Sequence, residues 1–258
     1  MASTPDRHDL YEACTQTPER DVAFLRAIHG GSPRRLGEDF AGGAALSRAW
    51  VRRVRGGSAI ATDHDPEPLA RARGIPRLAC RVADVRAASG RCDVIAACNF
   101  SIGELHERAQ LLAYLRRARA RLVRGGIFVA DLYGGAAAWR IGTLRERRTL
   151  QDGSRIEYAW EQRAADQLDG RVENALHFTV TPPQGSRRRL RDAFRYHWRL
   201  WSPPELQEAL REAGFAATET WSRFEHALGT RGRIHPLRHR HGSELAEEWC
   251  LFLVGRKR

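Results

Sequence analysis

Short apolar runs alternate with helix-like segments through the first half of the chain. The run at 92–99 is apolar on both faces, as a central parallel strand is. The segment at 105–123 places leucines on one side and arginines on the other, the pattern of an amphipathic helix. Strands are predicted from Arg35 onward and over 58–63, 77–84, 92–99 and 127–131. Five strands separated by helices predict an α/β fold with a doubly wound parallel sheet, whose ligand sites lie at the carboxyl ends of the strands.

The pattern changes after residue 150. The segments 154–162, 171–181 and 189–200 are rich in residues that favour strands, and turn-like sequences separate them. They predict an antiparallel excursion of about three strands. Ser202 then has the position of a helix cap before two prolines, and 249–255 has the pattern of a last buried strand.

A turn of small residues, 40–44, connects the first strand to a helix predicted over 45–54. Small residues let the backbone approach a ligand, and the start of a helix presents unpaired amide groups. Two glycines before a helix are also ordinary loop chemistry, so the turn alone is weak evidence. Asp63, Asp84 and Asn99 follow the next three strands. Polar groups therefore gather at one edge of the predicted sheet.

This order of elements resembles the class I S-adenosylmethionine-dependent methyltransferases, from about residue 34 to 258. Glu38–Ala44 stands where that family has its acid-x-Gly-x-Gly-x-Gly loop, Asp63 ends the second strand, and 201–215 is similar to the helix before the sixth strand. Asn99-Phe100-Ser101 resembles the fourth strand end of a subgroup with an altered glycine loop. The resemblance implies a seven-stranded, mostly parallel, Rossmann-like methyltransferase fold. It also implies the domain division 1–30, an N-terminal helical cap, and 31–258, a methyltransferase domain with a substrate lid at 150–200.

The resemblance further implies a site for S-adenosylmethionine. Glu38 would hold the methionyl amino end, directly or through water, while the turn backbone passes against the cofactor. Asp63 would accept both ribose hydroxyls, because two carboxylate oxygens match a vicinal diol. Asp84 and Val85 would meet the adenine. The implied cofactor-binding residues are Tyr11, Glu38, Ala41, Gly42, Gly43, Asp63, Asp84, Val85 and Asn99.

Asn99 and Tyr133 are the candidate catalytic residues. Asn99 would lie near the transferred methyl group, and Tyr133 stands two residues beyond Asp131, at the mouth of the fifth strand. Tyr11 would fold over the cofactor from the N-terminal helix. His177, in a predicted strand, is a weaker candidate for a base, since a lone histidine more often packs or is exposed.

Three alternatives stay open at the level of sequence. Phe40 and Ala44 stand where the family motif has glycine, so either the turn tolerates side chains or cofactor affinity has been lost. Asp39 could take the role of Glu38 after a shift of one residue in register. Asp63 could also serve only as the cap of the helix that follows it.

Charge and cysteines narrow the function classes. A net charge of +12 would favour a polyanionic partner, but only Lys257 is a lysine and the arginines are dispersed without a nucleic-acid-binding motif. The first residues lack the apolar segment that a secretory signal needs, and no run of about 18 apolar residues occurs. The five cysteines form no CxxC pair. We expect a cytoplasmic protein with reduced thiols, no metal site and no membrane contact; its oligomeric state stays open.

The resemblance implies direct in-line transfer of the sulfonium methyl group to a small-molecule acceptor. The acceptor atom, oxygen, nitrogen or carbon, is open. One alternative is an RNA methyltransferase, which the net charge favours. The other is a non-catalytic protein of the same fold, because a fold does not determine a function.

Overall fold

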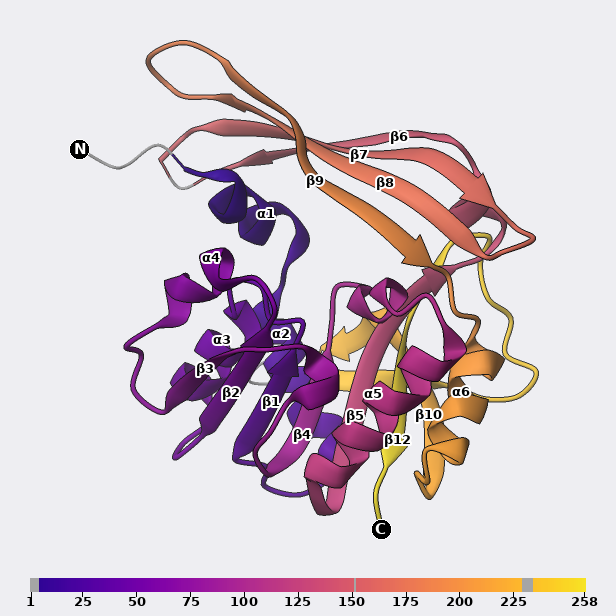
Figure 1. Cartoon of the computed structure of the whole chain (residues 1–258). Coiled ribbons are helices and arrows are strands. Elements are labelled where there is room, and N and C mark those ends of the chain that lie inside the picture. The colour runs from indigo at the N-terminus through magenta and orange to yellow at the C-terminus, as the bar shows by residue number, and fades with distance from the viewer. Residues whose placement is uncertain (1–4, 151, 229–233) are drawn as a thin grey trace.

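The computed structural model describes residues 5–150, 152–228 and 234–258. Its main sheet has eight strands in the order β11-β10-β12-β5-β4-β1-β2-β3 (Figure 1). The five strands predicted from the apolar runs pair in parallel, which confirms the doubly wound arrangement. Their bounds are β1 Arg35–Asp39, β2 Ser58–Asp63, β3 Leu78–Val82, β4 Cys92–Ala97 and β5 Leu122–Gly134.

The antiparallel side of the sheet has one strand more than predicted. β12 (Trp249–Arg256) lies between β5 and β10 (Ala217–Leu228) and pairs with both in antiparallel fashion. β10 then pairs along its other side with β11 (Ile234–His239). The main sheet therefore has eight strands rather than the expected seven. The additional strand, β11, covers the edge of β10 that would otherwise be open to solvent.

Helices cover both faces of the main sheet, as a parallel sheet requires. α2 (Pro18–His29) and α3 (Ala45–Arg53) pack against one face, where Trp50 is fully buried. α5 (Arg108–Arg121) and α6 (Pro203–Glu212) pack against the other. Shorter helical segments lie in the connections: α4 Pro66–Leu69, η1 Ala70–Ala72, η2 Val85–Ala87, η3 Ser101–Glu104 and η4 Ala136–Trp139.

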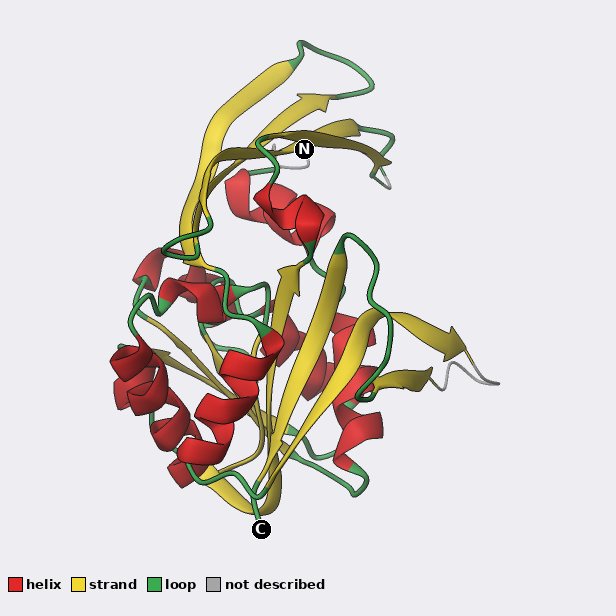
Figure 2. Ribbon diagram, turned by 90° about the vertical axis from the view of Figure 1, so that its right-hand side faces the viewer, coloured by secondary structure: helices red, strands yellow, loops and turns green. Residues whose placement is uncertain are grey.

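A second, antiparallel sheet stands above the carboxyl ends of the main sheet (Figures 1 and 2). We call it the lid sheet. It has four strands rather than about three, and it begins at 142 rather than near 150. Its first strand escaped prediction because all eight residues are exposed and show no apolar alternation. The strands are β6 Gly142–Thr149, β7 Arg155–Asp166, β8 Arg171–Thr181 and β9 Arg188–Arg199.

The helix α1 (Arg7–Thr15) lies between the lid sheet and the main body (Figure 2). Its buried Leu10 and Cys14 join the apolar cluster of the lid sheet, which includes Phe178. Its contacts with the main body are polar, such as the ion pair between Glu12 and Arg48. The predicted N-terminal helical cap therefore consists of two helices that pack on different sheets.

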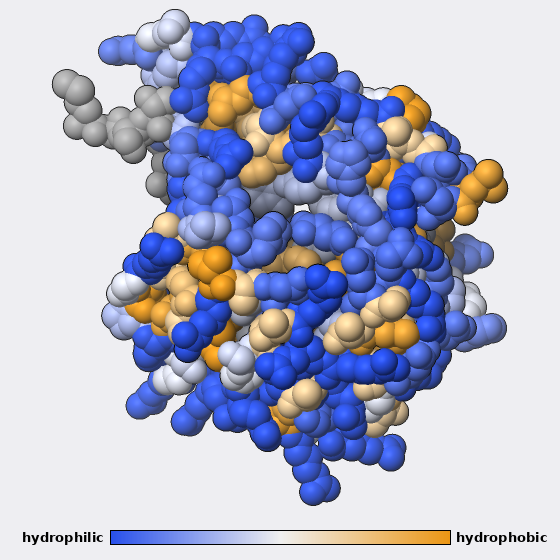
Figure 3. Space-filling model, viewed as in Figure 1, coloured by the Kyte–Doolittle hydropathy of each residue, from blue (hydrophilic) through white to orange (hydrophobic). Residues whose placement is uncertain are grey.

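The outer surface is largely hydrophilic, and it is hollowed between the lid sheet and the main body (Figure 3). Among the described residues, no helix combines the length and the hydropathy that crossing a bilayer would require.

Candidate functional site

The turn after β1 has the backbone conformation of a glycine-rich loop, although only one of its three left-handed positions is a glycine. Phe40, Gly42 and Ala44 have φ angles of 56°, 48° and 55°. These are the three positions at which the family motif has glycine. A side chain in this left-handed region costs about 1–2 kcal/mol per residue. The turn therefore tolerates Phe40 and Ala44, and it holds conformational strain at the candidate site.

Glu38 and Asp39 point to opposite sides of β1. A Glu38 carboxylate oxygen accepts the backbone N–H of Ser47 at 2.7 Å, at the start of α3, where Ala44 offers no side-chain cap. Burial raises the pKa of Glu38 to about 7. Glu38 lines none of the described cavities near the turn, so its predicted contact with a methionyl amino group stays a prediction.

Asp39 belongs to a buried ion pair on the other side of β1. Its two oxygens accept Arg121 Nη1 at 2.9 and 2.7 Å, and Tyr114 donates its hydroxyl at 3.0 Å. Asp39 is fully buried and Arg121 is 3% exposed. Asp39, which a shift of one residue in register would have put in the role of Glu38, is thus already bound by Arg121 and Tyr114 on the opposite side of β1.

Asp63 connects the end of β2 to the turn. Its Oδ2 accepts the Gly42 N–H at 2.7 Å, and its Oδ1 accepts the Asp65 N–H at 2.9 Å. The side-chain cap of α4 is Asp65, which accepts the Glu67 N–H. A carboxylate has about four acceptor positions, so Asp63 can accept two further donors.

Asp84 and Val85 lie at the end of β3. Asp84 caps η2 through the Arg86 N–H and pairs with the Arg86 guanidinium, whose hydrogen bonds lower the pKa of the Asp84 carboxyl. Val85 is buried beside it. Arg86 brings a positive charge to this end of the site, and the sequence analysis did not identify it as a site residue.

Asn99 and Phe100 form a second left-handed turn, with φ angles of 62° and 61°. Asp131 holds this turn by accepting both backbone N–H groups, at 3.0 Å from Asn99 and 2.7 Å from Phe100. Arg223 Nε lies 3.0 Å from Asp131, and Asp21 lies 3.5 Å from the same guanidinium. A buried carboxylate near the end of a strand requires a charged or hydrogen-bonding partner, but the sequence does not show which arginine supplies it.

Three cavities follow one another along the carboxyl edge of the main sheet. The small cavity, of about 170 Å³, surrounds Asp84 and Val85. The central cavity, of about 470 Å³, lies against Gly42 and Gly43. The lid cavity, of about 510 Å³, surrounds Tyr133 beneath β6 and β7.

Each cavity shares wall residues with the next. The small and central cavities share Phe40, Asp63, His64 and Glu104. The central and lid cavities share Tyr11, Asn99 and Trp198. The predicted site residues Tyr11, Ala41, Gly42, Gly43, Asp63, Asp84, Val85, Asn99 and Tyr133 therefore all line one of these three neighbouring cavities, whereas Glu38 does not.

Aromatic side chains form much of the lid cavity wall. Tyr133 packs against Phe100, Trp160 and Trp198, with ring centroids 4.9, 6.2 and 6.2 Å apart. Asn174 donates its amide to the Tyr133 hydroxyl at 3.3 Å. Burial raises the pKa of Tyr133 well above its usual value, so the phenol is neutral at neutral pH.

Two buried polar atoms in these walls have no hydrogen-bond partner among the described residues. They are the Ser101 hydroxyl, in the wall of the central cavity, and the Trp198 indole nitrogen, in the wall shared with the lid cavity. Buried polar groups are ordinarily hydrogen-bonded. Both residues line the cavities, so a polar occupant that reached these atoms would satisfy them.

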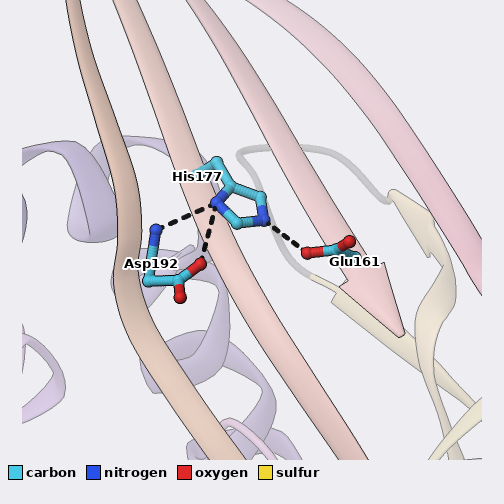
Figure 4. A group of neighbouring side chains, drawn as sticks. All are labelled: Glu161, His177 and Asp192. Carbon is cyan, nitrogen blue, oxygen red and sulfur yellow. Dashed lines mark hydrogen bonds and ion pairs between the residues drawn. The ribbon is translucent and has the colours of Figure 1, made fainter. Parts of the chain in front are cut away.

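His177 lies on the outer face of the lid sheet, away from these cavities. Neighbouring β7 residues alternate between the lid cavity and this outer face, where Glu161 meets His177 at 3.0 Å (Figure 4). The other ring nitrogen accepts the Asp192 N–H at 3.0 Å, and Arg163 pairs with both carboxylates. This cluster is an ion-pair network across three strands, and His177 is not positioned as a base.

No protein family model matches the chain, and no curated protein matches its sequence. Solved structures match nearly its whole length. DesVI of Streptomyces venezuelae has a TM-score of 0.74 at 16% identity, covering 99% of this chain and 100% of that chain. CalS10, an amino pentose methyltransferase from Micromonospora echinaspora involved in calicheamicin biosynthesis and solved with S-adenosylmethionine, has a TM-score of 0.68 at 16% identity, covering 100% and 99%.

The sugar N-methyltransferase KedS8 from a Streptoalloteichus species is similar to the same degree, with a TM-score of 0.68 at 16% identity, covering 100% of this chain and 95% of that chain. At these identities the likeness concerns the fold. It includes the lid sheet and α1 as well as the main sheet, because the matches span both chains almost completely. The chain therefore has the fold of the class I S-adenosylmethionine-dependent methyltransferases.

Proposed function

We propose that this protein transfers a methyl group from S-adenosylmethionine to a small-molecule acceptor bound in the lid cavity. The observation that carries the proposal is the series of three neighbouring cavities, which share first Asp63 and then Asn99 as wall residues. The small and central cavities have the acceptors and backbone that an adenosyl group and a methionyl chain require. The lid cavity has the volume of a small-molecule site.

In this proposal the chain's own residues position the two reactants. Asp63 accepts the ribose hydroxyls with the positions that Gly42 and Asp65 leave free, and Asp84 and Val85 contact the adenine. Bound S-adenosylmethionine supplies a sulfonium methyl group that is already activated for displacement. Glu38 acts behind the turn, where it binds the start of α3 and holds the loop backbone in place.

Asn99 lies where the central and lid cavities meet, and Asp131 fixes its backbone. This position suits a residue that orients the acceptor toward the methyl group. Orientation and exclusion of water can lower such a barrier by about 7–11 kcal/mol without a covalent intermediate. Tyr133 forms part of the wall of the lid cavity and presents a neutral hydroxyl group.

For the acceptor we favour an amine on a sugar-like ring. CalS10 and KedS8 are named for an amino pentose and for sugar N-methylation. The lid cavity here combines aromatic faces, among them Trp160, with the polar side chains Gln162 and Glu248. Aromatic faces pack on rings and attract cationic amines, and polar groups at the rim can accept hydroxyl protons. An oxygen or carbon acceptor is the competing outcome.

The test is methyl transfer from S-adenosylmethionine with a labelled methyl group to a panel of amino sugars, matched with the same sugars carrying a hydroxyl in place of the amine. Labelled product from amines alone supports the finer proposal. Product from the hydroxyl compounds assigns the acceptor atom to oxygen. No product from any small molecule, together with salt-sensitive methylation of RNA, would favour the nucleic-acid alternative.

A further inference from the structure

Glu104 is the one acidic wall residue shared by the small and central cavities apart from Asp63. It ends η3, whose first residue follows the left-handed turn held by Asp131. Its side chain is exposed to the solvent of these two cavities, and it forms no hydrogen bond or ion pair with any residue in the described parts of the chain. The fold therefore presents a second, free carboxyl group beside the one that we assign to the ribose.

The packing of η3 fixes this position. A Cβ atom on Gly103 would meet Trp198 Cβ at 2.9 Å, so η3 lies directly against the lid strand β9. Leu105, on the other side, is buried in the core beneath α5. Glu104 is thus held from both sides at the junction of the two cavities.

We propose that Glu104 binds the adenosyl group in its protonated form and acts as a hydrogen-bond donor opposite the acceptor Asp63. This inference rests on the proposed function and adds to it a proton that is bound together with the cofactor. A protonated carboxyl offers one O–H donor, whereas a carboxylate only accepts. The negative charge of Asp63 also disfavours a second carboxylate beside it, so Glu104 is the member of the pair that favours its protonated form.

The surroundings of Glu104 favour its protonated form. Partial removal of water by the surrounding cavity walls, and then the Asp63 carboxylate, raise the pKa of Glu104 to about 7, while His64 acts in the opposite direction. A bound adenosyl group would displace water from the carboxyl and raise its pKa further. The remaining charged groups around the two cavities are Arg7, His8 and Glu12 from α1, Asp65 and Arg71 beside α4, Asp84 and Arg86 at η2, and Asp192 and Arg195 from β9.

The sign of the pH dependence follows from the raised pKa. Below it, the free protein already carries the proton and binding is strongest. Above it, each pH unit reduces the fraction of protein ready to bind by up to tenfold. With a pKa of about 7, the affinity falls by roughly 25-fold between pH 6.5 and 8.5.

The experiment is calorimetric titration of the full chain with S-adenosylhomocysteine at pH 6.5, 7.5 and 8.5, in two buffers of different ionisation enthalpy. We expect the loss of affinity given above and the uptake of up to one proton per site at pH 7.5. Adenosine serves as a second probe, because it carries no group that titrates in this range. Glu104→Gln keeps an N–H donor, so its affinity should stay close to the acidic wild-type value at every pH.

His8→Asn and His64→Asn are the matched controls, since both histidines line the central cavity together with Glu104. Both should retain the pH dependence. Equal wild-type affinity at pH 6.5 and 8.5, or the same pH dependence in Glu104→Gln as in the wild type, would overturn the inference and leave the proposed function intact. Absence of binding by either probe at all three pH values would overturn the proposed function itself.

Discussion

The Asp63 carboxylate accepts the backbone N–H of Gly42 at 2.7 Å, which joins the end of β2 to the turn after β1. One side chain therefore shapes the turn and faces the cavities. Asp63→Asn should weaken binding of S-adenosylhomocysteine by about 10- to 150-fold, because hydrogen bonds to a charged group contribute about 1.5–3 kcal/mol. Calorimetry measures the change. Asp65→Asn is the control, since asparagine also caps helices well; equal affinities for wild type and Asp63→Asn would contradict the assignment.

Asp131 and Arg223 should be strongly coupled. Both are buried, and Asp131→Asn would leave the guanidinium with only the more distant Asp21. Removing one partner of a buried ion pair costs about 3–5 kcal/mol. Urea unfolding of Asp131→Asn, Arg223→Met and the double variant forms a cycle, and the double variant should lose about 0.5–3 kcal/mol less than the two single losses added together. Additive losses would show that the pair does not act as a unit.

Glu38 makes stability depend on pH in a definite direction. Its folded pKa, about 7, lies above the ordinary value of 4.5 because the carboxyl is buried. The resulting stabilisation is complete below about pH 4.5 and is lost as the pH rises to about 7. Glu38→Gln should therefore gain stability relative to wild type between pH 4.5 and 8, by roughly 2–4 kcal/mol. Parallel stability curves from denaturant unfolding would refute this.

Neighbouring alanines at the start of α3 should respond differently to glycine. Ala44 has a φ of 55°, whereas Ala45 is the first residue of the helix, and both are buried. Ala45→Gly should cost about 1 kcal/mol. Ala44→Gly removes the left-handed strain, which offsets the lost methyl contact, so it should be about 1–2 kcal/mol more stable than Ala45→Gly. Thermal unfolding compares them, and equal losses would mean that the turn is not strained at Ala44.

Tyr133 should act through its shape and its neutral hydroxyl. Because burial raises its pKa, the phenol is a poor proton acceptor at neutral pH. Tyr133→Phe keeps the ring against Trp198 and loses only the contact with Asn174. We expect kcat to fall by less than about tenfold, since positioned acid–base catalysis contributes about 10²–10⁴. A steady-state loss of 10³ or more in kcat would assign Tyr133 a catalytic proton transfer.

Much of the main sheet was predictable because its strands have clear apolar runs. Asp63, Asp84 and Asn99 follow such runs directly, so the carboxyl edge of the sheet could be assembled from the chain alone. The side of β1 to which the Glu38 side chain points could not be predicted. β1 is buried on both faces, so alternation did not show that Glu38 meets the start of α3 while Asp39 meets Arg121.

The missed features depend on partners distant in sequence. β6 is polar and exposed, and it is a strand because it pairs with β7. Arg223 lies 92 residues beyond Asp131, and only folding brings them together. Glu104 could be named from the sequence as a polar candidate after the fourth strand, but only the packing of η3 against Trp198 shows that it lies between two cavities.

The most direct test of the account is calorimetric titration of the wild-type chain at pH 6.5 with S-adenosylmethionine and S-adenosylhomocysteine. The account predicts saturable binding of both, with one site per chain and mutual competition. No heat of binding from either ligand at millimolar concentration, with the chain folded by circular dichroism, would contradict the central claim that these cavities hold the methyl donor.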